Sequence, residues 1–121
     1  MKIAVAGVGY VGLVTAVTLA DVGHDVICLD VDKGKLKMLA EGISPIYEYG
    51  LEELMLKNRE RLEFTDDVTK YSEAQVIIIG VGTPEKEDGS ADLSAVFSVA
   101  DSIADNCSDG TVVVVKSTVP I

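Results

Sequence analysis

The fold of this chain is determined by the segment Gly7-Val8-Gly9-Tyr10-Val11-Gly12. It follows a short apolar run, residues 2–6, and opens a long apolar segment, residues 11–22, that has the length of a helix. A second apolar run, residues 25–29, ends on the acidic residue Asp30. The order strand, G-x-G-x-x-G, helix, strand and acid predicts a dinucleotide-binding unit.

Each residue type in this pattern has a physical role. Gly7 permits the tight turn, Gly9 lets the backbone approach a pyrophosphate without a Cβ, and Gly12 lets the helix pack closely on the strand. The N–H groups and partial positive charge at the helix start attract the anion. Asp30 stands 18 positions after Gly12, where such a fold places a ribose-binding carboxylate.

The acid at the end of the second strand favours NAD over NADP. The Asp30 carboxylate can accept hydrogen bonds from both adenosine ribose hydroxyls, whereas a 2′-phosphate would bring a like charge against it. Two such charges about 4 Å apart repel by roughly 1–4 kcal/mol at effective dielectric constants of about 80 to 20. No arginine follows Asp30 to reverse this preference.

The amino-acid composition limits the classes of protein to which the chain can belong. The 121 residues, 48% of them hydrophobic, suffice for one domain that buries about two thirds of its unfolded surface. No run of about 20 apolar residues predicts a membrane span, and the first strand leaves no room for a signal peptide, so a cytoplasmic location is expected. The formal net charge of −10 argues against nucleic acid as a partner, whereas glycine loops bind phosphate with little net positive charge.

Neither cysteine is predicted to be reactive. Cys28 lies inside the second strand, and both cysteines are expected to be small core residues. The helical stripe that places Cys107 in the core consists of Leu93, Val96, Phe97, Ala100, Ile103, Ala104 and Cys107. The single histidine, His24, is interpreted as a loop residue. No Cys/His cluster has metal-ligand spacing, so neither a metal site nor a histidine-based acid–base pair is expected.

Strand and helix patterns alternate along the rest of the chain. Further strands are predicted at residues 62–65, 75–80 and 111–115, and the last of these, rich in valine, is expected to be buried on both faces. Helices are predicted at residues 32–40, 51–58, 67–71 and 92–106, the last of them capped by Asp92. The alternation predicts an α/β fold, a Rossmann-type doubly wound parallel sheet of strand order 3-2-1-4-5. A sixth strand would complete it, so residues 1–121 are interpreted as a truncated cofactor domain.

Three further segments carry a resemblance to a known family. They are Gly42-Ile43-Ser44-Pro45, Gly82-Thr83-Pro84 and Ser117-Thr118-Val119-Pro120. With the glycine motif, and in this order, they resemble the N-terminal domain of the nucleotide-sugar dehydrogenases, the UDP-glucose/GDP-mannose dehydrogenase family, and most of all its members that oxidise UDP-glucose. The resemblance covers essentially the whole chain. One departure is Tyr49, where the family usually has proline.

The resemblance implies an activity for the complete enzyme. Members of this family oxidise the C6 alcohol of a UDP-sugar to the carboxylate in two NAD-dependent steps, through a cysteine thioester that water hydrolyses. That cysteine and the main sugar-binding residues lie in later domains, and Cys28 and Cys107 match neither its motif nor its place. The chain alone is therefore expected to be inactive.

The resemblance also implies a set of site residues. Val11 would present its backbone N–H to the pyrophosphate, and Lys35 would reach the same ribose as Asp30. Thr83 and Thr118 would line the cofactor cleft, and Thr118 would also hold the catalytic water. The full cofactor-binding set is Gly7, Gly9, Tyr10, Val11, Gly12, Asp30, Lys35, Thr83 and Thr118.

Three alternatives stay open. GDP-mannose and UDP-N-acetylmannosamine dehydrogenases share this domain plan. A non-catalytic NAD-sensing module would explain a chain without a nucleophile, although Thr118 argues against it. Hydroxyacid or phosphogluconate-type dehydrogenases share the glycine motif, but the G-T-P and S-T-V-P motifs together are not expected in them. Separately, residues 112–115 are predicted to form an unpaired edge, which makes a homo-oligomer of the fragment a hypothesis.

Overall fold

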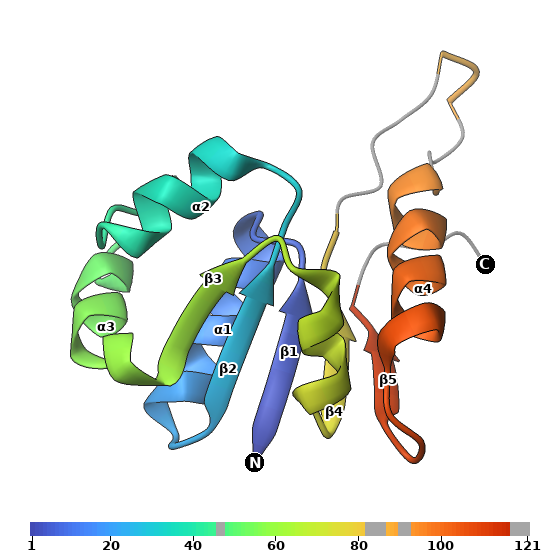
Figure 1. Ribbon diagram of the computed structural model, residues 1–121. Coiled ribbons are helices and arrows are strands. Elements are labelled where there is room, and N and C mark those ends of the chain that lie inside the picture. The colour runs from blue at the N-terminus through green and yellow to red at the C-terminus, as the bar shows by residue number, and fades with distance from the viewer. Residues whose placement is uncertain (46–47, 82–86, 90–92, 117–121) are drawn as a thin grey trace.

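The computed structural model describes residues 1–45, 48–81, 87–89 and 93–116. Helices and strands alternate as the sequence predicts (Figure 1). In chain order the elements are β1 (Lys2–Ala6), α1 (Tyr10–Asp21), β2 (Asp25–Leu29), α2 (Lys33–Ala40), α3 (Leu51–Lys57), the 3-10 helix η1 (Arg59–Arg61), β3 (Leu62–Thr65), the 3-10 helix η2 (Val68–Glu73), β4 (Val76–Ile79), α4 (Ser94–Asn106) and β5 (Val112–Val115).

Five parallel strands form one sheet in the order β3-β2-β1-β4-β5, which confirms the predicted order. In the register of the sheet, Val5 of β1 pairs with Cys28 of β2 on one side and with Ile78 of β4 on the other. The direction of winding reverses between β1 and β4, and the crevice at such a reversal is where open α/β sheets bind ligands. The glycine motif follows β1 and therefore lies at that point.

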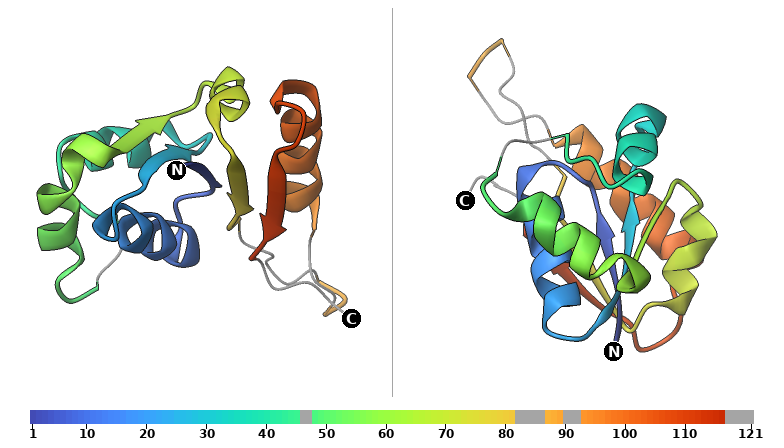
Figure 2. Two further views of the ribbon diagram at one scale, coloured as in Figure 1. Left: turned by 90° about the horizontal axis from the view of Figure 1, so that it is seen from below. Right: turned by 90° about the vertical axis from the view of Figure 1, so that its left-hand side faces the viewer.

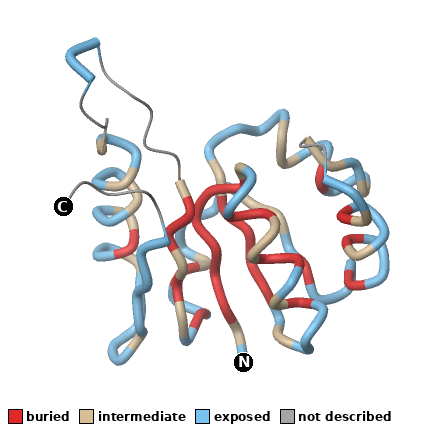
Figure 3. Tube along the Cα trace, turned by 180° about the vertical axis from the view of Figure 1, so that it is seen from behind, coloured by how far each residue is buried: buried red, intermediate tan, exposed pale blue. Residues whose placement is uncertain are grey.

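Two apolar cores cover the two faces of the sheet. On one face, Ile3 and Val5 pack with the buried residues of α1 and α3. On the other face, Ala4 and Ala6 pack with residues of η2, β4 and α4. Figures 2 and 3 show these layers and the buried trace through β1 and α1. Because both faces of the central strands are covered, their sequences are continuously apolar.

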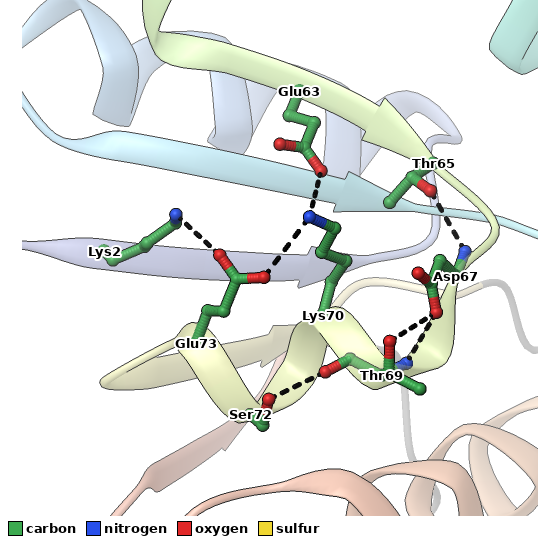
Figure 4. A network of polar contacts seen from close by, with 8 residues as sticks. All are labelled: Lys2, Glu63, Thr65, Asp67, Thr69, Lys70, Ser72 and Glu73. Atoms are coloured by element: carbon green, nitrogen blue, oxygen red, sulfur yellow. Dashed lines mark hydrogen bonds and ion pairs between the residues drawn. The ribbon is translucent and has the colours of Figure 1, made fainter.

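The segment between β3 and β4 forms a 3-10 helix, η2, where the sequence predicts a helix at residues 67–71. Asp67 caps it by accepting hydrogen bonds from the Thr69 hydroxyl at 2.6 Å and from the Thr69 backbone N–H at 3.0 Å, and these two bonds lower the pKa of Asp67. A row of charges then joins η2 to two strands (Figure 4). Lys2 contacts Glu73 at 2.9 Å, and Lys70 contacts Glu73 at 3.3 Å and Glu63 at 3.7 Å.

This row of charges shifts the titration of its members. Hydrogen bonds from Lys2 and Lys70 lower the pKa of Glu73, and the hydrogen bond to Glu73 raises the pKa of Lys70. These side chains are partly exposed to solvent, so their ion pairs add little to stability. They connect η2 to β1 and β3.

Two predictions about the carboxyl-terminal part of the chain are wrong. The valines of β5 are 43% to 57% exposed and not buried on both faces, because neither apolar core extends over this edge strand of the described sheet. Cys107 is exposed, and Phe97 of the predicted core stripe is 63% exposed. The reason is that α4 packs against η2, with Ile103 buried in the second core, and so presents much of that stripe to solvent.

Other boundaries differ from the predictions by one or two residues. Helix α4 begins at Ser94 with Leu93 in the N-cap position, and Asp92, the predicted cap, lies outside the described residues. Helix α3 ends at Lys57, one residue earlier than predicted. Within the part of the chain that the structure describes, no helix combines the length and the apolar character needed to cross a bilayer.

Candidate cofactor-binding site

The turn after β1 depends on the first glycine of the motif. Gly7 has φ of +98°, a conformation that side chains with a Cβ rarely adopt. A Cβ built there would also lie 2.8 Å from Cγ1 of Val81. The Gly7 N–H donates a 2.7 Å hydrogen bond to the Leu29 carbonyl, which ties the turn to the end of β2.

Helix α1 packs directly on this turn through its own glycine. A Cβ on Gly12 would overlap the carbonyl oxygen of Gly7, so the close approach predicted for Gly12 is confirmed. A third partner, which the glycine motif does not include, is Gly80 directly after β4, whose Cβ would lie 3.0 Å from the Cα of Gly12. The signal that could have revealed it is a glycine directly after the buried strand that neighbours β1.

The first turn of α1 has the geometry of an anion site. Gly9 occupies the N-cap position, and a Cβ there would meet nothing within 4 Å. The backbone N–H groups of Tyr10, Val11 and Gly12 have no acceptor within the helix, since the first turn of any helix lacks them. No acidic residue lies in this first turn. A pyrophosphate therefore fits against it, and the exposed Val11 belongs to this turn.

The Asp30 carboxylate is held by hydrogen bonds from two backbone N–H groups, one of them in the glycine loop. Its Oδ2 accepts a 2.9 Å hydrogen bond from the Val8 N–H, and its Oδ1 accepts one of 2.9 Å from the Asp32 N–H. A carboxylate has about four acceptor positions, so two remain for ribose hydroxyls. Asp30 thus anchors the glycine loop, and it also lines the cavity beside that loop. The sequence motif gives no sign of this anchor.

Lys35 lies in the first turn of α2, which begins soon after Asp30. Its backbone N–H donates a 3.1 Å hydrogen bond to Oδ1 of Asp32, the N-cap residue of the helix. Its side chain forms no ion pair with the described residues. The ammonium group is therefore available, and contact with the ribose stays a prediction.

A cavity of about 200 Å³ opens beside Gly7 and Asp30. Its walls are mostly apolar and come from the ends of β1 and β2, from η2 and from α4. Tyr71 of η2 lines it, and burial raises the pKa of this phenol to about 12. The cavity adjoins the residues predicted to bind ribose and pyrophosphate, so it lies where the base of a dinucleotide would extend.

Tyr10 connects the glycine loop to a second loop. Its hydroxyl donates a 2.7 Å hydrogen bond to Oε2 of Glu48, and this bond raises the pKa of Tyr10. Tyr10 belongs to the cofactor-binding set that the family resemblance implies, but the sequence gives no sign of its contact with Glu48. Because Glu48 precedes α3, the bond links the start of α1 to the connection between α2 and α3.

The structure does not test two of the predicted site residues. Thr83 and Thr118 lie outside the described residues, so their roles stay predictions.

Cys28 is buried as expected, and burial raises the pKa of its thiol to about 12, which leaves it unreactive. Across residues 1–45, 48–81, 87–89 and 93–116, no group of three or more His, Cys, Asp or Glu side chains could hold a metal ion.

The chain is similar along its whole length to known dehydrogenases. It is 51% identical to the UDP-glucose 6-dehydrogenase of Rhizobium meliloti and 50% identical to the UDP-glucose 6-dehydrogenase YwqF of Bacillus subtilis. Each alignment covers 100% of this chain but only 29% and 28% of the relative, so the chain spans less than a third of their length.

Solved structures of similar proteins have the same fold. The GDP-mannose dehydrogenase of Pseudomonas aeruginosa superposes with a TM-score of 0.92 at 40% identity, over 98% of this chain and 29% of that one. The UDP-glucose dehydrogenase of Pyrobaculum islandicum gives 0.92 at 38% identity over the same shares. The model of the UDP-glucose/GDP-mannose dehydrogenase family, NAD binding domain, matches residues 1–121. The chain therefore belongs to the UDP-glucose/GDP-mannose dehydrogenase family, of which it forms the NAD-binding domain.

Proposed function

We propose that residues 1–121 are the NAD-binding domain of a UDP-glucose 6-dehydrogenase, which oxidises UDP-glucose to UDP-glucuronate in two NAD-dependent steps. The observation that carries the proposal is identity of 50% or more, along the whole chain, to two proteins of that name. The central and C-terminal domains that bind the UDP-sugar, and the nucleophilic cysteine, would belong to the rest of the enzyme. A cytoplasmic location, without nucleic acid or membrane as a partner, is part of this proposal and rests on the sequence.

The roles of the residues follow from the site geometry. The free N–H groups at the start of α1 would bind the pyrophosphate, with Val11 as one donor and Gly9 leaving room for the phosphate oxygens. Asp30 would accept hydrogen bonds from the adenosine ribose, and the unpaired Lys35 ammonium would approach the same ribose. When bound, NAD would supply the hydride acceptor for oxidation at C6 of the sugar.

Two threonines complete the proposed site. Thr83 follows β4 and Thr118 follows β5 in the sequence, and the carboxyl ends of parallel strands border the cofactor crevice. Thr118 would lie near the nicotinamide and would hold the water that hydrolyses the thioester. The nucleophile that forms the thioester would come from another domain, since Cys28 is buried and Cys107 is at the far end of α4.

Binding by this chain tests the cofactor part of the proposal. Calorimetry with NAD and NADP is expected to show weak binding of NAD and weaker binding of NADP, because the 2′-phosphate would face Asp30. Tighter binding of NADP would contradict the role of Asp30. With UDP-glucose added, the purified chain is expected to produce no NADH, and steady NADH production would contradict the missing nucleophile.

A chimera tests the activity. Residues 1–121 would replace the matching N-terminal domain of the Rhizobium meliloti relative, and NADH production on UDP-glucose would be measured. Activity is expected, and it should be lost when Asp30→Ala is introduced. An inactive chimera that still binds NAD would instead favour the NAD-sensing alternative. GDP-mannose and UDP-N-acetylmannosamine would be assayed with the full-length protein, because sugar choice lies mostly outside this domain.

A further inference from the structure

The first turn of α1 has no side-chain cap of its own. Its N-cap residue is Gly9, which forms no side-chain hydrogen bond, and no acidic residue lies in the turn. A cap would accept a hydrogen bond from a backbone N–H of the first turn, and the proposed pyrophosphate needs those same groups. A contact that orders this turn for the pyrophosphate must therefore come from another segment and leave its N–H groups free.

Two acidic residues from distant segments contact this region in that way. Asp30 accepts a hydrogen bond from the N–H of Val8, which precedes the helix. Glu48 accepts the 2.7 Å hydrogen bond from the Tyr10 hydroxyl. In the part of the chain that the structure describes, no other side chain is hydrogen-bonded to residues 8–12. Neither acid uses the backbone N–H groups of residues 10–12.

The segment that carries Glu48 is itself fixed against α1. The Leu51 N–H donates a 3.2 Å hydrogen bond to the Glu48 carbonyl, which joins Glu48 to the start of α3. Leu51 and Met55 of α3 are 4% and 2% exposed and pack with the buried residues of α1. At the other end of α3, the Asn58 amide donates a 3.1 Å hydrogen bond to Oδ1 of Asp21, the last residue of α1. Glu48 therefore has a defined position relative to the first turn.

We propose that Glu48 is a positioning residue of the pyrophosphate site, which it orders through the Tyr10 hydroxyl. This role rests on the proposed binding of NAD. The bond restricts the Tyr10 side chain, and with it the backbone of the first turn, before the cofactor binds. Freedom that is already lost in the free chain need not be lost on binding. The bond therefore strengthens pyrophosphate binding, although Glu48 has the same sign of charge as the phosphates.

The charge of Glu48 by itself predicts the opposite effect. A carboxylate near a pyrophosphate repels it, so if charge alone mattered, every neutral residue at position 48 would bind NAD more tightly than glutamate. Glu48→Gln and Glu48→Ala separate the two effects. Both variants remove the charge, but only glutamine keeps an oxygen that can accept the Tyr10 hydrogen bond.

The test compares the dissociation constants of these two variants for NAD, measured by NMR titration. Glu48→Ala should bind NAD roughly 2- to 12-fold more weakly than Glu48→Gln, the value of one hydrogen bond. When Tyr10→Phe is added to both, the difference should fall below about 1.5-fold, because the donor is then missing. Equal affinities of Glu48→Ala and Glu48→Gln would overturn the inference, and so would a difference that persists with Tyr10→Phe.

Two control variants change the same residue types nearby. Glu53→Ala removes an exposed acid from the first turn of α3, and Tyr49→Phe removes a hydroxyl from a residue that is 98% exposed. Neither should weaken NAD binding, and circular dichroism checks that every variant is folded. A loss in Glu53→Ala as large as that in Glu48→Ala would mean that the contact with Tyr10 is not the cause.

A comparison of ligands distinguishes positioning from a general loss of structure. ADP-ribose contains the pyrophosphate, and adenosine does not. The difference between Glu48→Ala and Glu48→Gln should appear with ADP-ribose and be absent with adenosine, because only the pyrophosphate would contact the first turn. An equal difference with both ligands would show that Glu48 only stabilises the domain, and the inference would be overturned.

A measurement without ligand separates this inference from the proposed function. The Leu13 N–H donates a 2.9 Å hydrogen bond to the Gly9 carbonyl, so its exchange with deuterium reports opening of the first turn. Exchange should be roughly 2- to 12-fold faster in Glu48→Ala than in Glu48→Gln. If the unchanged chain binds no NAD, the proposed function fails while this difference remains. If NAD binds and Leu13 exchanges equally fast in both variants, the inference is overturned.

Discussion

The two halves of the sheet have similar sequences and opposite environments. In the half built on β1 and β2, the residues Val5, Val26 and Cys28 are at most 1% exposed. In the outer strand β5, four consecutive valines are 43% to 57% exposed. The difference shows that neighbours, and not composition, decide burial: β1 has a strand on each side and cores on both faces, whereas β5 borders a strand on one side. We call the half built on β1 and β2 the enclosed half, and the glycine loop and Asp30 belong to it.

The largest effect is expected at the contact between α1 and the turn. Gly12→Val should cost more than about 4 kcal/mol of unfolding free energy, because its Cβ would overlap the Gly7 carbonyl. Gly9→Ala is the matched control, since a Cβ there meets nothing within 4 Å. Urea denaturation measures both, and equal losses in the two variants would contradict this account of the enclosed half.

Truncation of one apolar side chain in each half tests the comparison directly. Leu13→Ala should lower the unfolding free energy by about 2–5 kcal/mol, because Leu13 is 0% exposed. Val114→Ala, at a position that is 43% exposed, should cost less than about 1 kcal/mol. Thermal and urea unfolding measure both variants. If Leu13→Ala and Val114→Ala lose similar amounts of unfolding free energy, β5 is covered in solution and the contrast between the halves is wrong.

Asp30→Ala should destabilise the chain by about 1–3 kcal/mol, because the Val8 N–H loses a charged acceptor. NAD binding should be lost as well. Asp25→Ala, at the exposed start of the same strand, should change stability by less than about 0.5 kcal/mol. A stability of Asp30→Ala equal to that of the unchanged chain would show that the loop holds its shape without this anchor.

The two cysteines sharpen the contrast without any substitution. Cys107 is exposed, and Cys28 is fully enclosed with its pKa raised to about 12. Because the thiolate is the reactive form, the native chain should label with iodoacetamide at Cys107 alone near pH 8. Both thiols should label in denaturant. The labelling of each cysteine is measured by mass spectrometry. If Cys28 of the native chain is labelled as fast as Cys107, the enclosed half opens readily.

The smallest change in stability is expected at the edge of the sheet. Among the described strands, β5 has a neighbour on one side only. Its free edge can pair with a second copy, so we expect the chain to self-associate at high concentration. Val114→Lys should abolish the association and alter the unfolding free energy by less than about 0.5 kcal/mol. Sedimentation that finds the unchanged chain strictly monomeric would remove the homo-oligomer hypothesis.

The parts of the fold that were predictable depend on local pattern. The strand order followed from the alternation of elements, and the roles of Gly7 and Gly12 followed from their spacing after β1. The rest depends on contacts between distant segments. The orientation of α4 is set by η2, the exposure of β5 by its place at the edge, and the bond between Tyr10 and Glu48 joins residues 38 positions apart. None of these leaves a periodic signal in the sequence.

The hydrogen bond from Val8 to Asp30 has a consequence for redesign. An engineer who wishes to convert the domain from NAD to NADP would first replace the acid at the end of β2 with a small neutral residue. In this chain that substitution also removes the acceptor that holds the glycine loop. Conversion would therefore need two changes together: room and positive charge for the extra phosphate, and a new acceptor for the Val8 N–H.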